Sequence, residues 1–288
     1  PTEGIAVKIT LDGFTGGHSG VEIHEGHTNA IKAMGRLLLE ENTSGTLFKL
    51  VSINGGGKDN AIPRGCEAVA MYTKQDEYEA QLKKLGLLDD KSFTCTAEIL
   101  PETPALCMDD KTTHAVLSLL TLVRDGVLSM SAHVKGLVAH SRNLGIVKTL
   151  TDGEGKPTAV KFSMSTRSPS NSHLDDSERE LEMLALACTG DDENATHRAR
   201  YPGWDYAPVS PLRDLWTRIS EETYGVTPRI EVIHAGLECG ILCDKLGEMD
   251  IISVGPDMKD IHTPREMLSI PSVERTYRLV CETLRSLA

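Results

Sequence analysis

Apolar and polar residues alternate along residues 5–11, which is the period of a strand with one buried face. Similar strand patterns recur at residues 46–53, 66–73, 92–100, 143–150 and 158–167. Helix patterns lie between them, from about Thr28 and at residues 75–86, 112–124 and 175–188. The apolar stripe of the first helix is Ile31, Met34, Leu37 and Leu38. Strands and helices in this irregular order predict an α+β unit.

The order of predicted helices and strands changes after a polar stretch at residues 189–196 and the segment Tyr201–Trp204. Beyond it, helix and strand patterns alternate, at residues 209–224, 229–233, 237–245, 250–254 and 271–286. This alternation predicts a parallel α/β sheet, but the elements are too few for a complete one. Residue 1 is Pro rather than Met, and a strand pattern follows almost at once. We therefore expect the chain to be a fragment of a longer protein.

Charge and cysteine content narrow the class of protein. The 288 residues include 42 acidic and 30 basic ones, a formal charge of −12. Nucleic-acid binding and polybasic membrane anchoring need clustered Lys and Arg, so both are disfavoured. No run of about 18 apolar residues and no secretory signal is present in the sequence. Seven scattered cysteines indicate reduced thiols and a cytoplasmic location. Cys239 and Cys243 lack a second pair and are interpreted as ordinary thiols.

A glycine-rich loop follows the first strand and presents His18 between Gly17 and Ser19. Glycines let the backbone turn tightly, and a histidine on such a loop can transfer a proton or stabilise an oxyanion. Many glycine-rich loops only reverse the direction of the chain. The pattern leaves both interpretations open.

Two further polar residues are placed by the backbone around them. Pro63 holds Ile62 extended and orients Asn60 at a rigid turn, where the amide either donates to a ligand or only stabilises the turn. Arg167 ends the strand at 158–167 on its polar face, where a guanidinium can bind a carboxylate through two hydrogen bonds. An exposed surface arginine is the alternative interpretation.

Two similar segments follow the predicted strands of the last third. His234 and Glu238 come after the strand at 229–233, and His262 comes after the strand at 250–254. Both positions lie beyond the carboxyl ends of presumed parallel strands, where α/β sheets bind ligands. Because imidazole is a common zinc ligand, His262 is a candidate for one. A catalytic zinc needs about three protein ligands, and the sequence contains neither His-Glu-x-x-His nor His-x-Asp.

Five segments stand out in order along the chain: Gly16–His24, Asn60–Arg64, Tyr201–Trp204, Ile233–Gly240 and Ser253–Pro256. Together they resemble the aminoacyl-histidine dipeptidases, also called cytosol non-specific dipeptidases. This family belongs to the dizinc metallopeptidases, with carnosinase and peptidase T. The resemblance runs from Ile5 to about Leu287. It implies that the chain corresponds to the C-terminal three-fifths or so of such an enzyme.

The resemblance implies an α+β lid domain followed by the C-terminal part of an α/β zinc-peptidase catalytic domain. Residues 8–197 would form the lid, which covers the substrate and makes a homodimer contact. Residues 198–288 would form the returning part of the catalytic domain. The family binds two zinc ions, but its other metal ligands and its general-base Glu lie upstream of the segment that matches residue 1. We therefore expect at most a partial metal site and a fragment that is inactive, or nearly so, alone.

The resemblance also assigns roles to single residues. His262 matches the family's last zinc ligand. His18 matches the lid histidine that stabilises the oxyanion of the tetrahedral intermediate, often from the partner subunit. Asn60 and Arg167 match lid residues near the substrate, and Arg167 would bind the terminal carboxylate of the peptide. Glu238 would line the substrate cleft, with no role that we can assign.

These observations favour metal-dependent hydrolysis of dipeptides, Xaa-His and others, by the intact protein. Two alternatives stay open. The chain can be a non-catalytic dimerisation or binding module, although a partial catalytic domain would then expose apolar sheet surface. The intact protein can also be an N-acyl-amino-acid amidohydrolase of the same family, because both substrate classes present a carboxylate to Arg167 and Asn60.

Overall fold

The computed structural model describes residues 4–43, 48–72, 93–104, 106–132, 134–232, 237–247, 249–259 and 265–288. Its main feature is a seven-stranded sheet in which all pairings are antiparallel. The strands are β1 (Ile5–Asp12), β3 (Phe48–Gly55), β5 (Cys66–Tyr72), β6 (Thr94–Ile99), β7 (Gly126–Met130), β8 (Val138–Thr151) and β9 (Pro157–Arg167). Their order is β6-β1-β5-β3-β8-β7, and β9 pairs along nearly all of β8.

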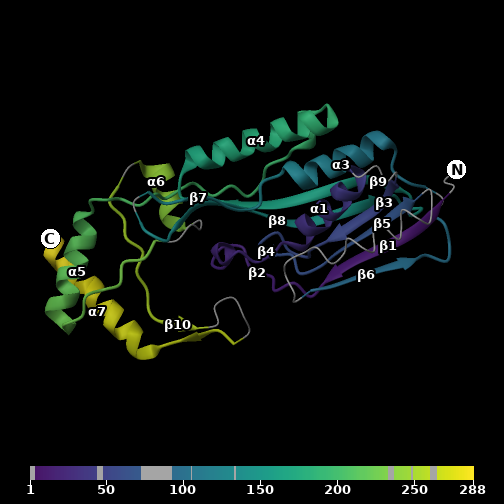
Figure 1. Cartoon of the computed structure of the whole chain (residues 1–288). Helices are drawn as coiled ribbons and strands as arrows, with labels where there is room; N and C mark the ends of the chain where they lie inside the picture. The colour runs from purple at the N-terminus through teal and green to yellow at the C-terminus, as the bar shows by residue number, and fades with distance from the viewer. Residues whose placement is uncertain are drawn as a thin grey trace.

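Three helices cover one face of this sheet (Figure 1). They are α1 (Ala30–Thr43), α3 (Asp110–Leu122) and α4 (Asn171–Thr189). Val7, Ile9 and Leu11 alternate towards the helices and are buried, which confirms the predicted strand pattern. Lys8 lies on the opposite face and forms an ion pair with Glu67 of β5. The predicted apolar stripe of α1 is buried in the same core, at Ile31, Met34, Leu37 and Leu38.

The start of β8 carries a run of polar residues that is buried in the sheet. Residues 140–145 are all buried. The Arg142 side chain has no exposed surface, and its Nη1 lies 3.2 Å from a carboxylate oxygen of Glu180 on α4. Arg124 donates to both oxygens of Glu180, from Nε at 3.0 Å and from Nη2 at 2.5 Å. Hydrogen bonds from Arg124, and then from Arg142, lower the pKa of Glu180 to about 2. This ion-pair group fastens α4 to the sheet.

The short 3₁₀ helix η2 (Asp192–Asn194) packs against α4. The elements beyond it gather at the end of the molecule opposite the N-terminus (Figure 1). They are α5 (Pro211–Tyr224), α6 (Glu238–Leu246), β10 (Met258–Lys259), β11 (Met267–Leu268) and α7 (Ile270–Leu287). β10 pairs antiparallel with β11, and α5 packs against α7. Ser210 caps α5 by accepting the amide of Arg213 at 3.1 Å, and its hydroxyl donates to Asp250.

The predicted strands at residues 229–233 and 250–254 are wrong over the residues that the structure describes. Residues 226–232 and 249–257 take no strand conformation. A strand is stable only beside another that pairs its backbone amides and carbonyls, and no strand of the described chain lies beside these segments. Within the described residues, the predicted parallel α/β sheet of the last third is therefore not formed. The helices on either side of these segments are confirmed.

Other predicted elements differ from the structure in smaller ways. β7 was not predicted, because its five residues show no apolar alternation. β8 begins at Val138, five residues before the predicted start at 143, because the polar run at 140–143 does not read as a buried strand. The predicted helix at 75–86 lies outside the described residues. Among the described helices, none combines the length and apolar character needed to cross a membrane.

The buried ion-pair group predicts a selective loss of stability. Glu180→Gln leaves the fully buried Arg142 guanidinium without its counter-charge, so we expect the free energy of unfolding to fall by about 3 kcal/mol at pH 7. Glu178→Gln on the same helix is the matched control. Its partner Arg200 is partly exposed, and the expected loss is at most about 1 kcal/mol.

Denaturant unfolding at several pH values measures both effects. The pKa of Glu180 is about 2 in the folded chain against an ordinary value of 4.5. Its stabilisation is therefore fully present above pH 4.5 and is lost as the pH falls towards 2. The difference between the parent chain and Glu180→Gln must shrink over this range. Equal losses in the two variants at pH 7 would contradict the assignment.

Candidate active site

A two-stranded ribbon brings His18 and Asn60 together. β2 (Gly17–His18) pairs antiparallel with β4 (Ala61–Ile62), so that His18 stands opposite Ala61. The amide of Ser19 donates to the carbonyl of Asn60 at 3.0 Å, which extends the contact by one residue. In Figure 1 the ribbon lies at the end of the sheet towards α6. Both side chains are exposed there.

The imidazole of His18 is held in one tautomer by its own loop. Its Nδ1 accepts the backbone amides of Gly20 at 3.0 Å and Val21 at 3.2 Å. In the neutral ring the proton therefore resides on Nε2, which is left as a hydrogen-bond donor. Burial, and then the nearby charge of Arg167, lower the pKa of His18, with a weaker opposing effect of Glu22. The ring therefore favours the neutral, Nε2-protonated state.

Gly20 is required for this arrangement. A Cβ at Gly20 would lie 2.8 Å from Cε1 of His18, closer than real Cβ atoms approach other atoms, and a tight 3.0 Å from its Nδ1. The Glu22 carboxylate accepts the backbone amide of His18 on the next turn, just before the short 3₁₀ helix η1 (Ile23–Glu25). The glycine-rich pattern therefore serves to fold the loop around the imidazole.

Asn143 of β8, which the sequence analysis did not single out, fixes the loop that carries Asn60. Its buried Nδ2 donates to the carbonyls of Asp59 and Ala61, both at 2.8 Å, on either side of Asn60. Gly145 lets the loop lie against β8, because a Cβ there would stand 2.5 Å from Cα of Asp59. One signal was present in the sequence, since Asn and Gly are depleted from strand interiors.

Arg167 reaches the same place from the end of β9. It pairs with Ser141 at the start of β8, and its Cζ lies 3.5 Å from where a Cβ on Gly20 would be. The side chain is half-buried, and burial lowers the pKa of Arg167, partly offset by the charge of Asp59. The guanidinium is thus a partly desolvated cation beside the His18 loop, the setting in which a carboxylate is bound most strongly.

Several buried polar atoms in and around these described residues lack a hydrogen-bond partner. Among the described residues, buried side-chain atoms that make no hydrogen bond include Ser19 Oγ, Asn143 Oδ1 and Arg167 Nε. Buried polar groups are nearly always paired in folded proteins, so three such atoms around one loop indicate a site for a polar ligand or ordered water. We call His18, Asn60, Asn143 and Arg167 the lid cluster.

The other two predicted site residues are not brought to the lid cluster by any described contact. Glu238 is exposed in the first turn of α6, where a negative charge is favourable. Gly240 fits α6 against the chain at Pro202, because a Cβ there would stand 2.5 Å from that carbonyl oxygen. His262 and His234 lie outside the described residues.

The described residues do not fit two zinc ions. No group of three or more His, Cys, Asp or Glu side chains able to hold a metal occurs in the described ranges. Cys239 and Cys243 lie on α6, and burial raises the pKa of Cys239, which favours the thiol over the metal-binding thiolate.

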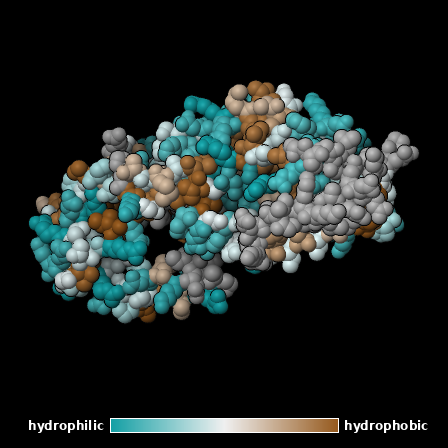
Figure 2. All heavy atoms as spheres, in the orientation of Figure 1, coloured by the Kyte–Doolittle hydropathy of each residue, from teal (hydrophilic) through white to brown (hydrophobic). Residues whose placement is uncertain are grey.

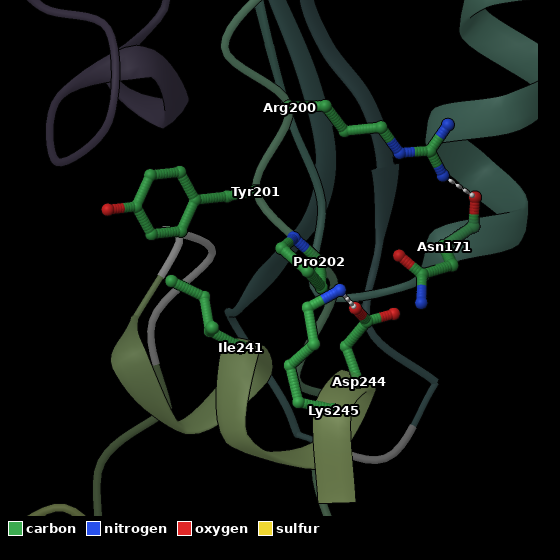
Figure 3. A pocket seen from close by; sticks show the side chains of 7 residues that line it. All are labelled: Asn171, Arg200, Tyr201, Pro202, Ile241, Asp244 and Lys245. Carbon is green, nitrogen blue, oxygen red and sulfur yellow. Dashed lines mark hydrogen bonds and ion pairs between the residues drawn. The ribbon is translucent and has the colours of Figure 1, made fainter. Parts of the chain in front are cut away.

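A separate hollow of about 690 Å³ lies between the start of α4, residues 200–202 and α6 (Figure 3). Its charged side chains already have partners. Arg200 binds Asp175 and Glu178 of α4, and Lys245 lies 3.0 Å from Asp244. Figure 3 shows the Lys245–Asp244 pair and a hydrogen bond from Arg200 to the backbone carbonyl of Asn171 at the wall of the hollow. The lid cluster therefore remains the better candidate for chemistry.

Comparisons with known proteins show which proteins this chain resembles. The M20 peptidase dimerisation domain matches residues 9–85. The cytosol non-specific dipeptidase of Escherichia coli (strain K12) is 32% identical over 291 residues, which cover 97% of this chain and 57% of the relative. The crystal structure of aminoacylhistidine dipeptidase from Vibrio alginolyticus matches with a TM-score of 0.84 at 29% identity. That match covers 99% of this chain and 58% of the other.

The likeness extends over nearly the whole chain in sequence and in fold. The chain nevertheless spans a little under three-fifths of the length of these relatives. Taken together, the matched domain, the sequence identity and the shared fold show that this chain is similar to the cytosol non-specific dipeptidases along nearly its whole length.

Proposed function

We propose that the chain is part of a metal-dependent dipeptidase that hydrolyses Xaa-His and other dipeptides, and that the lid cluster binds the substrate. The observation that carries this proposal is the tautomer of His18. Two backbone amides occupy Nδ1, so the donor on Nε2 is fixed beside a partly buried arginine. A neutral donor next to a cation suits a substrate that has a carboxylate and develops an oxyanion.

Each residue of the lid cluster has a separate part in this proposal. Arg167 binds the C-terminal carboxylate of the dipeptide. The Nε2–H of His18 donates to the oxygen of the scissile carbonyl as it gains negative charge, and the Asn60 amide donates to the substrate from the adjoining loop. Asn143 acts through Asn60 and is a positioning residue, because its hydrogen bonds are to the loop backbone. Activation of the attacking water is not assigned to the described residues.

The remaining proposals concern the intact protein. We propose that residues 8–197 form its lid and residues 198–288 part of its catalytic domain. The matched dimerisation domain supports a homodimer formed through the lid. We also propose a cytoplasmic location, a requirement for zinc with His262 as one ligand, and a place for Glu238 in the substrate cleft. The relatives are named as dipeptidases, which supports the reaction class.

Loss of the proposed oxyanion donor tests the role of His18. In the intact protein, His18→Ala should lower kcat for a dipeptide by about 10²- to 10³-fold, with a much smaller change in KM, because the donor acts mainly in the transition state. His24→Ala, an exposed histidine of η1, is the matched control and should change kcat less than about twofold. Equal effects of the two variants would refute the role.

A substrate change tests Arg167. Arg167→Ala should raise KM for unblocked dipeptides by about 10- to 100-fold, the range expected when a charged hydrogen-bonding partner is lost. Dipeptide C-terminal amides lack the carboxylate, so the variant should turn them over much like the parent enzyme. Lys161→Ala on the same strand is the control. An equal loss on acids and amides would contradict the proposal, and activity confined to N-acyl amino acids would favour the amidohydrolase alternative.

A further inference from the structure

Glu22 makes a contact with His18 that its place before η1 does not require. A side-chain oxygen at the start of a helix ordinarily accepts an amide of that helix, and the Glu22 carboxylate accepts none from η1. Its Oε2 instead accepts the backbone amide of His18, four residues earlier. The amide of Glu22 donates in turn to the carbonyl of His18 at 3.0 Å. Glu22 therefore binds both main-chain polar groups of His18.

The pairing of β2 with β4 leaves the amide of His18 in need of such an acceptor. Along an antiparallel pair, the amides of one strand point alternately towards and away from its partner. Ser19 donates to the carbonyl of Asn60, so the amide of His18 points away from β4. Gly17 leaves room for the carboxylate, because a Cβ there would stand 3.1 Å from Oε2 of Glu22. The carboxylate thus occupies a place that the strand pairing and a glycine create.

Polar contacts, rather than a large apolar core, hold the loop that carries His18. The apolar cluster to which η1 and β4 contribute consists of Ile23, Ile62 and Val138. Figure 2 shows mainly hydrophilic atoms where the ribbon of β2 and β4 lies in Figure 1. A hydrogen bond to an ionised acceptor is stronger than one between neutral groups. The bond from the His18 amide to the Glu22 carboxylate is therefore a main determinant of the shape of this loop.

We propose that Glu22 is a positioning residue that keeps the Nε2–H donor of His18 in place. While Glu22 fixes the backbone of His18, the imidazole Nδ1 stays on the amides of Gly20 and Val21. Without the carboxylate, the peptide group of His18 can rotate, the ring can leave these amides, and the proton can move to Nδ1. The proposal rests on the proposed role of His18 as a donor, but the arrangement of the ring is measurable without substrate.

The charge of Glu22 separates two variants. Burial, and then the Arg167 guanidinium at the end of β9, lower the pKa of His18, and the Glu22 carboxylate raises it. Glu22→Gln keeps an oxygen that accepts the His18 amide but removes the charge. It should therefore retain the tautomer of the parent chain and lower the pKa of His18 further. Glu22→Ala removes both the acceptor and the charge, so the tautomer should change as well.

Nuclear magnetic resonance of ¹⁵N in the histidine rings of the full chain tests the proposal. In Glu22→Ala we expect a clear population of His18 with the proton on Nδ1, whereas Glu22→Gln should keep it on Nε2. Glu25→Ala is the matched control, since it removes a nearby carboxylate that is paired with His27 at 3.1 Å. It should leave the tautomer and the pKa of His18 unchanged. Circular dichroism checks that all three variants keep the parent fold.

Turnover by the intact protein gives a second readout. Glu22→Ala should lower kcat for a dipeptide by about tenfold, the loss expected for one hydrogen bond to a charged group, with a much smaller change in KM. Glu22→Gln should recover most of this loss. The proposal is overturned if Glu22→Ala keeps the parent tautomer, or if both variants change it alike. A changed tautomer with unchanged kcat would support the positioning of the ring by Glu22 and would overturn the catalytic role of His18.

Discussion

The buried polar run at the start of β8 is the constraint on which the rest of the structure depends. Six consecutive residues, 140–145, are buried, and nearly every polar group among them needs a partner from another element. The partner of Arg142 is Glu180 on α4, and that of Asn143 is the backbone of the loop around Asn60. The amide of Leu144 donates to Asp125, whose buried carboxylate also accepts from Asn29. One strand segment thus fixes the helix layer and the site loop together.

The lid cluster follows from that constraint. Asn143 fixes the Asn60 loop through the carbonyls on either side of Asn60. Because β2 pairs with β4, the fixed loop also sets the position of His18. Arg167 enters from β9, whose register is set by the same part of β8. Burial lowers the pKa of both His18 and Arg167. A neutral hydrogen-bond donor, His18, therefore lies beside a partly desolvated cation, Arg167. A bound carboxylate would relieve the cost of that desolvation.

The sequence predicted the elements whose own residues show which face is buried. β1 was predicted from the alternation of its apolar residues, and α1 from its apolar stripe. The strands at 229–233 and 250–254 were predicted wrongly, because a strand needs a partner that this pattern does not reveal. His18, Asn60 and Arg167 were singled out from their local patterns and given roles by resemblance, and nothing in their spacing showed that they meet. Asn143 was missed because its contact lies more than 80 residues away in sequence.

The protonation state of His18 is the most direct test of its role as a fixed donor, and ¹⁵N NMR of the histidine rings during a pH titration of this chain measures it. We expect an unprotonated Nδ1 and a protonated Nε2 at pH 7, with a pKa below the ordinary value of 6.5. His18→Ala identifies the resonances. A proton on Nδ1 in the neutral ring, or a pKa at or above 6.5, would contradict the assignment of His18 as a fixed neutral donor.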